Sequence, residues 1–379
     1  MSDRLLHGNV LSLSRRLLSF NTVNPPGCER ECARFLVAQL ERAGFHTGLF
    51  EFSEERATLI ARRDGRGDRS PICFTGHVDT VPLGRAPWSK DPFTGELDGD
   101  KLYGRGSSDM KAAVAAMVVM AGRLSRIKDL SAGITLVLTA GEETCCEGAR
   151  YVVSLDNVLG KAGAIVVGEP TSIHPWIGHK GCVRFAVRTT GATAHASTPE
   201  LGDNAIHKAA EVITKLRAFD FGVPAHPVLG SPTLNIGTIS GGMNINSVPD
   251  QATLGIDIRT VPGQNDNEIR QALQRLLGDE VEIERLEGAR SLETDPSHEW
   301  VQRVFDIMEP LLKQRPEPAG AAYFTDASVL APAYGHPPVV IVGPGDPGMA
   351  HKTDEYCSLQ KMEQAVEAYT RIAMQWCCG

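Results

Sequence analysis

The sequence predicts an α/β fold in which a larger domain, with helices on both faces of a sheet, carries a smaller inserted α+β domain. Toward both ends of the chain, apolar β-branched runs alternate with amphipathic helices, which is typical of a parallel or mixed sheet covered by helices. Between these parts the expected order of elements changes to βαββαβ, which is the order of a ferredoxin-like unit. A chain of 379 residues also exceeds the usual size of a single hydrophobic core, so two domains are expected.

The first part of the larger domain is expected over residues 1–178. Two amphipathic helices, Leu5–Phe20 and Arg30–Ala43, flank the strong helix breaker Asn24-Pro25-Pro26-Gly27. Buried strands and helices then alternate in this order: strand 72–75, helix 109–124 beginning at Asp109, strand 134–139, helix 147–154 and strand 164–167.

The inserted domain is expected over residues 179–290, and about 110 residues suffice for a small domain. Its expected elements are strand 182–189, helix 203–217, strands 233–239 and 252–258, helix 266–277 and strand 280–285. The chain then resumes α/β character over residues 291–379, with helix 298–313, strand 338–342 and helix 358–376. These last elements are expected to complete the larger domain.

Composition excludes several classes of protein. The formal net charge of −8 argues against a nucleic-acid binder, which normally carries a basic face. Charged residues interrupt the leucine-rich N-terminus, and no apolar run reaches the ~20 residues of a membrane span, so we expect a cytoplasmic protein without membrane contact. Nine cysteines without disulfide spacing indicate free thiols in a reducing compartment. Cys28 and Cys32 alone lack the second pair that a zinc site needs.

Five short clusters of acidic residues and histidine carry the chemistry. They are Gly76-His77-Val78-Asp79, Gly106-Ser107-Ser108-Asp109-Met110-Lys111, Gly141-Glu142-Glu143, Gly168-Glu169-Pro170 and Ala350-His351. Three of them follow predicted buried strands, and ligands of open α/β sheets bind beyond the carboxyl ends of the strands. Two histidines together with the carboxylates of these clusters at one such edge predict a metal site.

His77 and Asp79 lie on one side of an extended segment, so Asp79 could orient a metal-binding imidazole through its second ring nitrogen. A buried His–Asp hydrogen bond without a metal is an equally good interpretation of this pair alone. Asp109 follows a glycine-rich turn, where it could cap a helix or bridge two metals. The phosphate-binding patterns that share such a turn are absent.

The adjacent pair Glu142-Glu143 gives the sharpest indication. Neighbouring carboxylates at the end of a strand repel each other, and their burial requires compensating positive charge, which two divalent metals would provide. One of the two can then bind metal, while the other faces the attacking water as a general base with a raised pKa. A solvated pair on a loop is the alternative.

Glu169 and His351 are unremarkable singly, but with the other residues they give two metals a balanced set of ligands. His77 and Glu169 would hold one metal, Glu143 and His351 the other, and Asp109 would be shared. Oxygen and nitrogen ligands without thiolate suit Zn²⁺, with Co²⁺ or Mn²⁺ as substitutes. We therefore expect two Zn²⁺ ions per chain.

Together with Ala194-His195, Gly241–Pro249 and Asp257-Ile258-Arg259, these clusters resemble the acetylornithine deacetylase / succinyl-diaminopimelate desuccinylase family of zinc amidohydrolases and peptidases. The resemblance extends from the first helix to Asp354-Glu355-Tyr356. It implies a zinc-peptidase-like three-layer catalytic domain and an inserted ferredoxin-like domain that acts as a lid and dimerises.

The resemblance also implies the roles of individual residues. The metal ligands would be His77, Asp109, Glu143, Glu169 and His351. Glu142 would deprotonate the attacking water, and Asp79 would assist catalysis beside it. On the lid, His195 would stabilise the oxyanion, in its own site or in that of the partner in a homodimer. Asn246 and Arg259 would hold the substrate carboxylate, which the planar guanidinium fork matches.

The substrate is expected to be an N-acyl amino acid with an uncharged acyl group, such as N-acetylornithine. Desuccinylases typically show Thr-Ser-Asp-x-Arg before the last strand, and Ser328 falls here where that arginine would lie. A desuccinylase, a dipeptidase or carboxypeptidase, and a carbamoyl-amino-acid hydrolase remain alternatives within the family. A relative that has lost catalysis and only binds a ligand is a further alternative.

Overall fold

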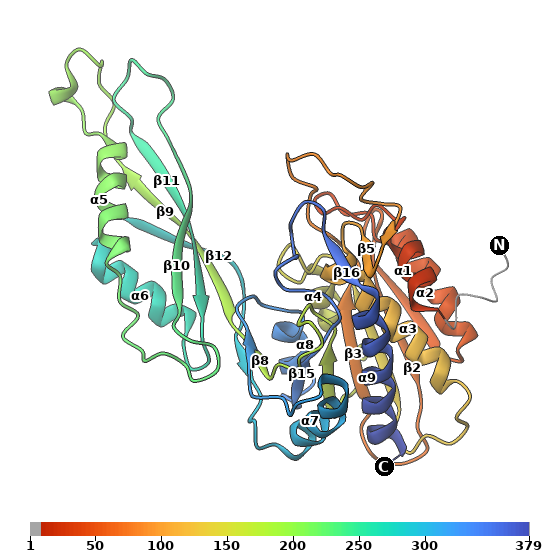
Figure 1. Cartoon of the computed structure of the whole chain (residues 1–379). Coiled ribbons are helices and arrows are strands. Elements are labelled where there is room, and N and C mark those ends of the chain that lie inside the picture. The colour runs from red at the N-terminus through yellow and green to blue at the C-terminus, as the bar shows by residue number, and fades with distance from the viewer. Residues whose placement is uncertain (1–8, 379) are drawn as a thin grey trace. The chain divides into compact units, whose positions relative to one another are not determined.

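The computed structural model describes residues 9–378, and these divide into two compact units (Figure 1). The larger unit combines the residues up to Gly178 with Glu293–Ala321 and the residues from Thr325 onward. The smaller unit comprises His179–Leu292 together with Ala322–Phe324. Residues 5–8 of the first predicted helix lie outside the described residues.

The larger unit is built on a six-stranded mixed sheet with the strand order β1-β2-β6-β3-β7-β15. The four strands β6, β3, β7 and β15 run parallel, whereas β1 and β2 form an antiparallel hairpin at one edge. Their bounds are β1 His46–Ser53, β2 Arg56–Arg63, β3 Ile72–His77, β6 Ile134–Thr139, β7 Ala164–Val167 and β15 Val339–Ile341. The parallel strands are fully buried, as their uninterrupted apolar sequences predict.

Helices cover both faces of this sheet, so the predicted three-layer fold class is confirmed (Figure 1). On one face α3 and α9 pack against β3, and on the other α4 contacts β2 while α8 contacts β7. The helices of this unit are α1 Val10–Leu18, α2 Arg30–Arg42, α3 Ala112–Leu124, α4 Glu147–Ser154, α7 Glu299–Leu312, α8 Ala327–Ala333 and α9 Leu359–Cys378. The alanine-rich α3 is almost entirely buried.

One predicted element begins in the wrong place. The helix expected to begin at Asp109 begins at Ala112, and Ser107–Lys111 form a π-helical turn before it. Asp109 has φ −124° and ψ 91°, which is extended rather than helical backbone. Asp109 is therefore not a helix cap, and its carboxylate is held outside the helical geometry.

A small sheet lies beside this turn. Strands β4 (Leu97–Asp98), β5 (Lys101–Tyr103) and β16 (Tyr356–Ser358) pair in the order β16-β5-β4. Because β5 leads into the turn, the pairing brings the start of β16 close to it in space. The short strands β8 (Gly178–His179), β13 (Leu292–Glu293) and β14 (Gly320–Ala321) lie at the sequence borders between the two units.

The smaller unit follows the expected βαββαβ order. Its elements are β9 Gly181–Thr190, α5 Ala205–Arg217, β10 Thr233–Gly241, β11 Gln251–Thr260, α6 Asp266–Leu277 and β12 Glu282–Ala289, with a 3₁₀ turn at Pro199–Leu201. The antiparallel sheet has the order β10-β11-β9-β12. Apolar side chains of β9 and β11, among them Phe185 and Ile256, form its core with residues of α5 and α6. Over residues 9–378, none of the helices has the length and apolarity that crossing a lipid bilayer would require.

Candidate metal centre

Parallel strands bring the predicted site residues to one edge of the six-stranded sheet. His77 is the last residue of β3, Glu142 and Glu143 follow β6, and Glu169 follows β7. The carboxyl ends of parallel strands meet at the same edge, which is where ligands of α/β sheets bind. The turn that carries Asp109 and the loop after β15 that carries His351 reach this edge too.

Side chains of five residues converge there in two groups. In the first group, His77 Nε2 lies 3.0 Å from Asp109 Oδ1 and 3.7 Å from Glu169 Oε1. In the second, His351 Nε2 lies 3.1 Å from Glu143 Oε2 and 3.5 Å from Asp109 Oδ2. The two oxygens of Asp109 therefore face two different histidines. The structure brings all five residues together in the predicted grouping, and their role as metal ligands stays a prediction.

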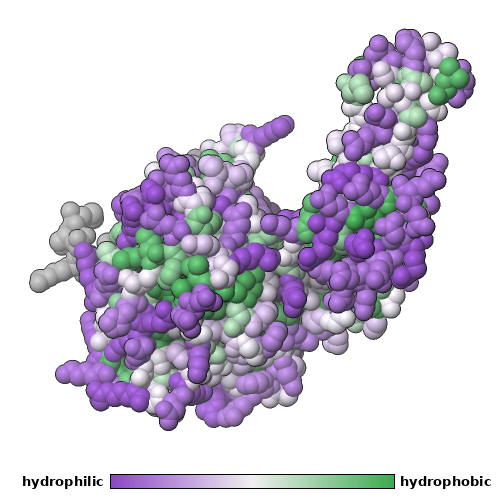
Figure 2. Space-filling model, turned by 180° about the vertical axis from the view of Figure 1, so that it is seen from behind, coloured by the Kyte–Doolittle hydropathy of each residue, from purple (hydrophilic) through white to green (hydrophobic). Residues whose placement is uncertain are grey.

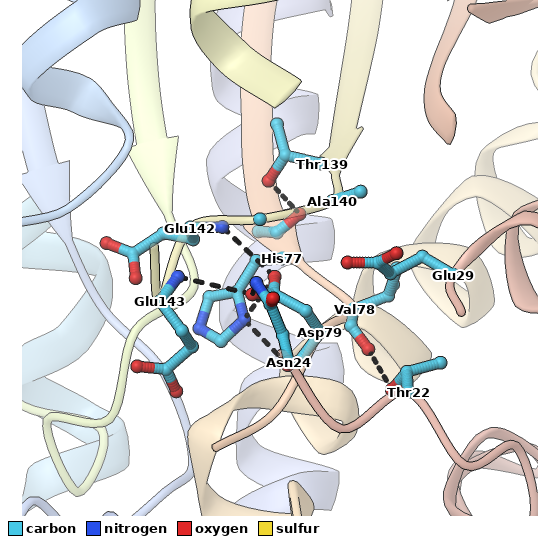
Figure 3. A network of polar contacts seen from close by, with 12 residues as sticks. Thr22, Asn24, Glu29, His77, Val78, Asp79, Thr139, Ala140, Glu142 and Glu143 are labelled. Carbon is cyan, nitrogen blue, oxygen red and sulfur yellow. Dashed lines mark hydrogen bonds and ion pairs between the residues drawn. The ribbon is translucent and has the colours of Figure 1, made fainter. Parts of the chain in front are cut away.

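Asp79 organises the surroundings of His77 and of the Glu142–Glu143 loop (Figure 3). Its side chain is fully buried, and it accepts hydrogen bonds from the backbone N–H groups of Glu142, at 3.1 Å, and Glu143, at 3.2 Å. His77 Nδ1 lies 3.0 Å from the Asp79 carbonyl oxygen and 3.4 Å from Asp79 Oδ1. The shorter contact to His77 thus comes from the backbone of Asp79, while its carboxylate holds the loop.

Glu142 has no hydrogen-bond partner for Oε1, although the side chain is only 5% exposed. Figure 3 shows the Glu142 and Glu143 side chains leaving the loop in different directions. Burial, reinforced by the negative charge of Glu169, raises the pKa of Glu142 well above its usual range. A buried carboxyl group with a free oxygen and a raised pKa is suited to carry a proton.

The other groups of the cluster are also shifted from their ordinary pKa values. Burial alone would lower the pKa of His77, but the carboxylates of Asp109 and Asp79 raise it well above the usual range. Hydrogen bonds to Asp109 and Glu143 raise the pKa of His351 to about 10. Burial raises the pKa of Glu169, whereas that of Asp109 falls because both histidines outweigh its burial.

The donor atoms fit a pair of divalent cations. Within each group of three, one atom per residue lies within 4.8 Å of the others, the groups being His77, Asp109 and Glu169, and Asp109, Glu143 and His351. Imidazole nitrogen and carboxylate oxygen are donors that Zn²⁺, Co²⁺ and Mn²⁺ accept. In addition, Glu142 Oε1 and Glu143 Oε1 are buried without a donor, and nearby cations would compensate this negative charge.

Three further residues of this edge were not found from the sequence. Asn24 Nδ2 donates to Asp79 Oδ2, at 3.0 Å, and to Thr144 Oγ1, at 2.9 Å. Asp326 is 2% exposed, accepts from the Thr139 hydroxyl, and burial raises its pKa to about 6. Glu355 is fully buried beside the Asp109 turn. The sequence offered only weak signals: a helix breaker for Asn24, the motif around Ser328 for Asp326, and the end of the family resemblance at Asp354-Glu355-Tyr356 for Glu355.

The predicted catalytic residue His195 and the predicted substrate-binding residues Asn246 and Arg259 of the smaller unit lie in two places. His195 pairs with Ser247 in an isolated bridge, and Asn246 O accepts from Ala196 N at 3.1 Å, so His195 and Asn246 are neighbours. Arg259 lies near the far end of β11, where its Nε donates to Asp257 Oδ1 at 2.8 Å. At about 3.3 Å per residue, the strand from Gln251 to Arg259 spans roughly 26 Å. Within this unit, Arg259 is therefore remote from the other two.

Comparison with known proteins gives a consistent result. A family model described as Peptidase family M20/M25/M40 matches residues 73–375. Acetylornithine deacetylase from Vibrio parahaemolyticus serotype O3:K6 is 30% identical over 348 residues, which is 88% of this chain and 88% of that protein. The M20 family metallo-carboxypeptidase Sso-CP2 from Sulfolobus solfataricus has the same fold, with TM-score 0.83 and 17% identity over 99% of each chain.

A second solved structure, the Bacillus subtilis YXEP protein, is described as a dinuclear metal binding peptidase from M20 family. It superposes with TM-score 0.74 and 17% identity over 98% of this chain and 99% of its own. The matches confirm the family resemblance found in the sequence.

Metal uptake is expected to release protons, and the apparent affinity is expected to rise with pH. The raised pKa values of His77, His351 and Glu169 favour their protonated forms, while metal ligands must be neutral imidazole or ionised carboxylate. Titration calorimetry of Zn²⁺ into chelator-treated protein, in buffers of different ionisation enthalpy, measures the protons released. His351→Ala should release fewer protons than the parent protein. His174→Ala changes a histidine outside the cluster and should release as many protons as the parent protein. An affinity that falls as pH rises would contradict this interpretation.

Proposed function

Because the chain belongs to Peptidase family M20/M25/M40, we propose that it hydrolyses the amide bond of a small N-acyl amino acid at a pair of divalent metal ions. Amide hydrolysis is the chemistry of this family and of the acetylornithine deacetylases, which are about 30% identical over most of the chain. The observation that carries the proposal is the buried carboxyl group of Glu142, whose Oε1 has no hydrogen-bond partner, beside two groups of metal-donor atoms that share Asp109.

The metals would be held by the residues that converge at the sheet edge. His77, Asp109 and Glu169 would hold one, and Asp109, Glu143 and His351 the other, with Zn²⁺ as the expected ion. When bound, such a pair polarises the amide carbonyl group and makes water more acidic. Asp79 would fix His77 and the adjacent loop, so that Glu142 and Glu143 keep separate tasks.

Glu142 would move the proton. Its carboxylate accepts a proton from the attacking water, whose oxygen forms the new bond to the carbonyl carbon. The same group then donates that proton to the amide nitrogen as the C–N bond breaks, which releases a carboxylic acid and an amine. The absence of a hydrogen-bond donor to Oε1 supports this role, because a donor would hold the carboxylate in its ionised form.

Replacement of Glu142 tests its role as the base. Glu142→Gln keeps the size of the side chain but cannot accept the proton, so kcat should fall about 10²–10⁴-fold. Metal analysis should still find the parent metal content, because Glu142 is not among the proposed ligands. The exposed Glu54→Gln is a matched control that should keep parental turnover. Parental kcat in Glu142→Gln would exclude Glu142 as the base.

The acyl group of the substrate is proposed to be uncharged. Ser328, at the position of the arginine typical of desuccinylases, is only 6% exposed, and its Oγ lies 3.7 Å from Cys146 Sγ. Asp326, two residues before Ser328, is also buried, and its carboxyl group would repel a succinyl carboxylate. These residues therefore favour N-acetyl over N-succinyl amino acids, with acetylornithine as the first compound to test.

A substrate panel tests this choice directly. We expect kcat/KM for N-acetyl amino acids to exceed that for the matching N-succinyl compounds, since Ser328 stands where desuccinylases typically carry the arginine for the succinyl carboxylate. N-formyl and N-carbamoyl amino acids and dipeptides complete the panel and separate deacylase from peptidase activity. Preference for N-succinyl compounds would contradict the proposed acyl group, while cleavage of none of them would contradict the proposed reaction.

Residues of the smaller unit are proposed to bind substrate from two copies of the chain. His195 would stabilise the oxyanion, and Asn246 and Arg259 would hold the substrate carboxylate. A small N-acyl amino acid cannot reach across the roughly 26 Å that separate Arg259 from the end of the sheet near His195. Either Arg259 or the pair His195 and Asn246 must then come from a partner subunit, so we propose a homodimer.

The surface of the smaller unit supports a dimer. Strand β10 is at the edge of its sheet, and β10 and the loop after it expose the large apolar residues Ile239, Met243 and Ile245. Figure 2 shows apolar surface on this unit, including its tip. An unpaired edge strand with exposed apolar side chains is suited to pairing with a second copy of itself.

Mixing two inactive variants tests this arrangement. His195→Ala and Arg259→Ala should each lose most activity, but a refolded equimolar mixture should regain roughly a quarter of parental activity, because half of the sites in mixed dimers are intact. The dimer itself is measured by analytical ultracentrifugation. If both residues serve a site from the same chain, the mixture will stay as inactive as its components.

A further inference from the structure

We infer that Glu355 is a positioning residue that fixes Asp109, and through it both proposed metal positions. The inference rests on the proposed role of Asp109 as the shared ligand. Glu355 belongs neither to the two donor groups nor to the proposed proton path, yet its side chain is fully buried next to the Asp109 turn. The burial of Glu355 at this position is therefore explained by the contacts that it makes with the turn.

The Glu355 carboxylate accepts hydrogen bonds from the backbone of the turn that carries Asp109. Oε1 accepts from Ser108 N, at 2.8 Å, and from Asp109 N, at 3.0 Å. Oε2 accepts from Gly106 N at 3.0 Å. Three N–H groups of one turn thus point at a single carboxylate, in the manner of an anion-binding backbone nest.

An ion pair completes the contacts of this carboxylate. Arg105 Nη1 lies 2.6 Å from Glu355 Oε2, and both side chains are at most 1% exposed. Arg105 also donates to the carbonyl oxygens of Pro82, at 3.1 Å, and Lys352, at 3.2 Å. Each of these contacts is with a donor, so the carboxyl group of Glu355 is held in one place.

The backbone fixes Glu355 independently of its side chain. Gly104 N donates to the Glu355 carbonyl oxygen at 2.9 Å, and Tyr356, the next residue, pairs with Tyr103 in the β16–β5 ladder. The Ser108 hydroxyl donates to the Tyr356 carbonyl oxygen at 2.7 Å. The turn and the segment that holds it are therefore joined at several points, with the carboxylate at the centre.

The consequence for the proposed metals comes from the two oxygens of Asp109. Oδ1 faces His77 and Oδ2 faces His351, so a shift of the Asp109 backbone disturbs both groups of donors together. Gly106, at φ 87°, allows the turn to close around Glu355, and a Cβ there would lie 2.6 Å from Thr80 Cγ2. A purely structural ion pair would stabilise the fold without this specific effect on both donor groups.

Metal affinity, measured without reference to turnover, tests the inference. Glu355→Gln places an amide NH₂ group among donors, so the turn should shift and both metal-binding steps should weaken by about 10–100-fold. Chelator-treated protein is titrated with Co²⁺ against a competing chromophoric chelator, and its absorption spectrum reports the coordination. His351 belongs to only one of the two donor groups, so His351→Ala should weaken mainly one of the two metal-binding steps. Equal weakening of both steps in Glu355→Gln is the expected signature of a displaced shared ligand.

Two further variants separate positioning from general damage. Glu29→Gln removes another fully buried carboxylate, paired with Arg56 at 2.8 Å, and should lower the unfolding temperature while retaining parental metal affinity. Arg105→Lys keeps the charge and the three backbone hydrogen bonds, so it should remain folded and weaken both steps less than Glu355→Gln does.

Folded Glu355→Gln and Arg105→Lys proteins that bind both ions with parental affinity would overturn the inference. Equal losses in Glu355→Gln and Glu29→Gln would overturn it as well. If His77→Ala also bound both ions normally, the proposed metal site itself would be wrong, and the two failures are therefore distinguishable.

Discussion

Repulsion among buried carboxylates at the carboxyl edge of the β6–β3–β7 strands is the interaction around which the larger unit is arranged. Asp79, Asp109, Glu142, Glu169 and Asp326 are each at most 9% exposed there. The buried cations of the same unit are already engaged, since Arg105 pairs with Glu355 and Lys111 Nζ donates to the Phe20 carbonyl oxygen at 2.8 Å. Negative charge packed so closely needs either fixed donors or bound cations.

The carboxylates divide into two kinds according to their partners. Asp79 and Glu355 accept hydrogen bonds from three or four donors of the protein itself, so their carboxyl groups hold loops in place. Glu142 and Glu143 each keep one buried oxygen without any donor. This difference, more than the presence of acidic residues, distinguishes the supporting carboxylates from those available to cations and protons.

The sequence predicted those features that depend on neighbours along the chain. Uninterrupted apolar runs located β3, β6 and β7, and the clusters after them followed from the topology of parallel strands. The hairpin β1–β2 was not predicted, because charged residues such as Glu51 and Arg62 obscure the apolar pattern of an edge. Asn24 and Glu355 were missed for a different reason: their partners are 55 and 246 residues away, and no local pattern marks such contacts.

The separate tasks proposed for Glu142 and Glu143 follow from one fixed turn rather than from the chemistry of either residue. Both backbone N–H groups are bound to the two oxygens of Asp79, so the loop cannot rotate to exchange the two side chains. Glu143 Oε2 then lies 3.1 Å from His351 Nε2, while Oε1 of Glu142 has no hydrogen-bond donor. Two chemically identical neighbours thereby acquire different environments and different pKa values, with the larger increase on Glu142. The assignment of base and ligand thus depends on Asp79, whose position depends in turn on Asn24 and on the end of β3.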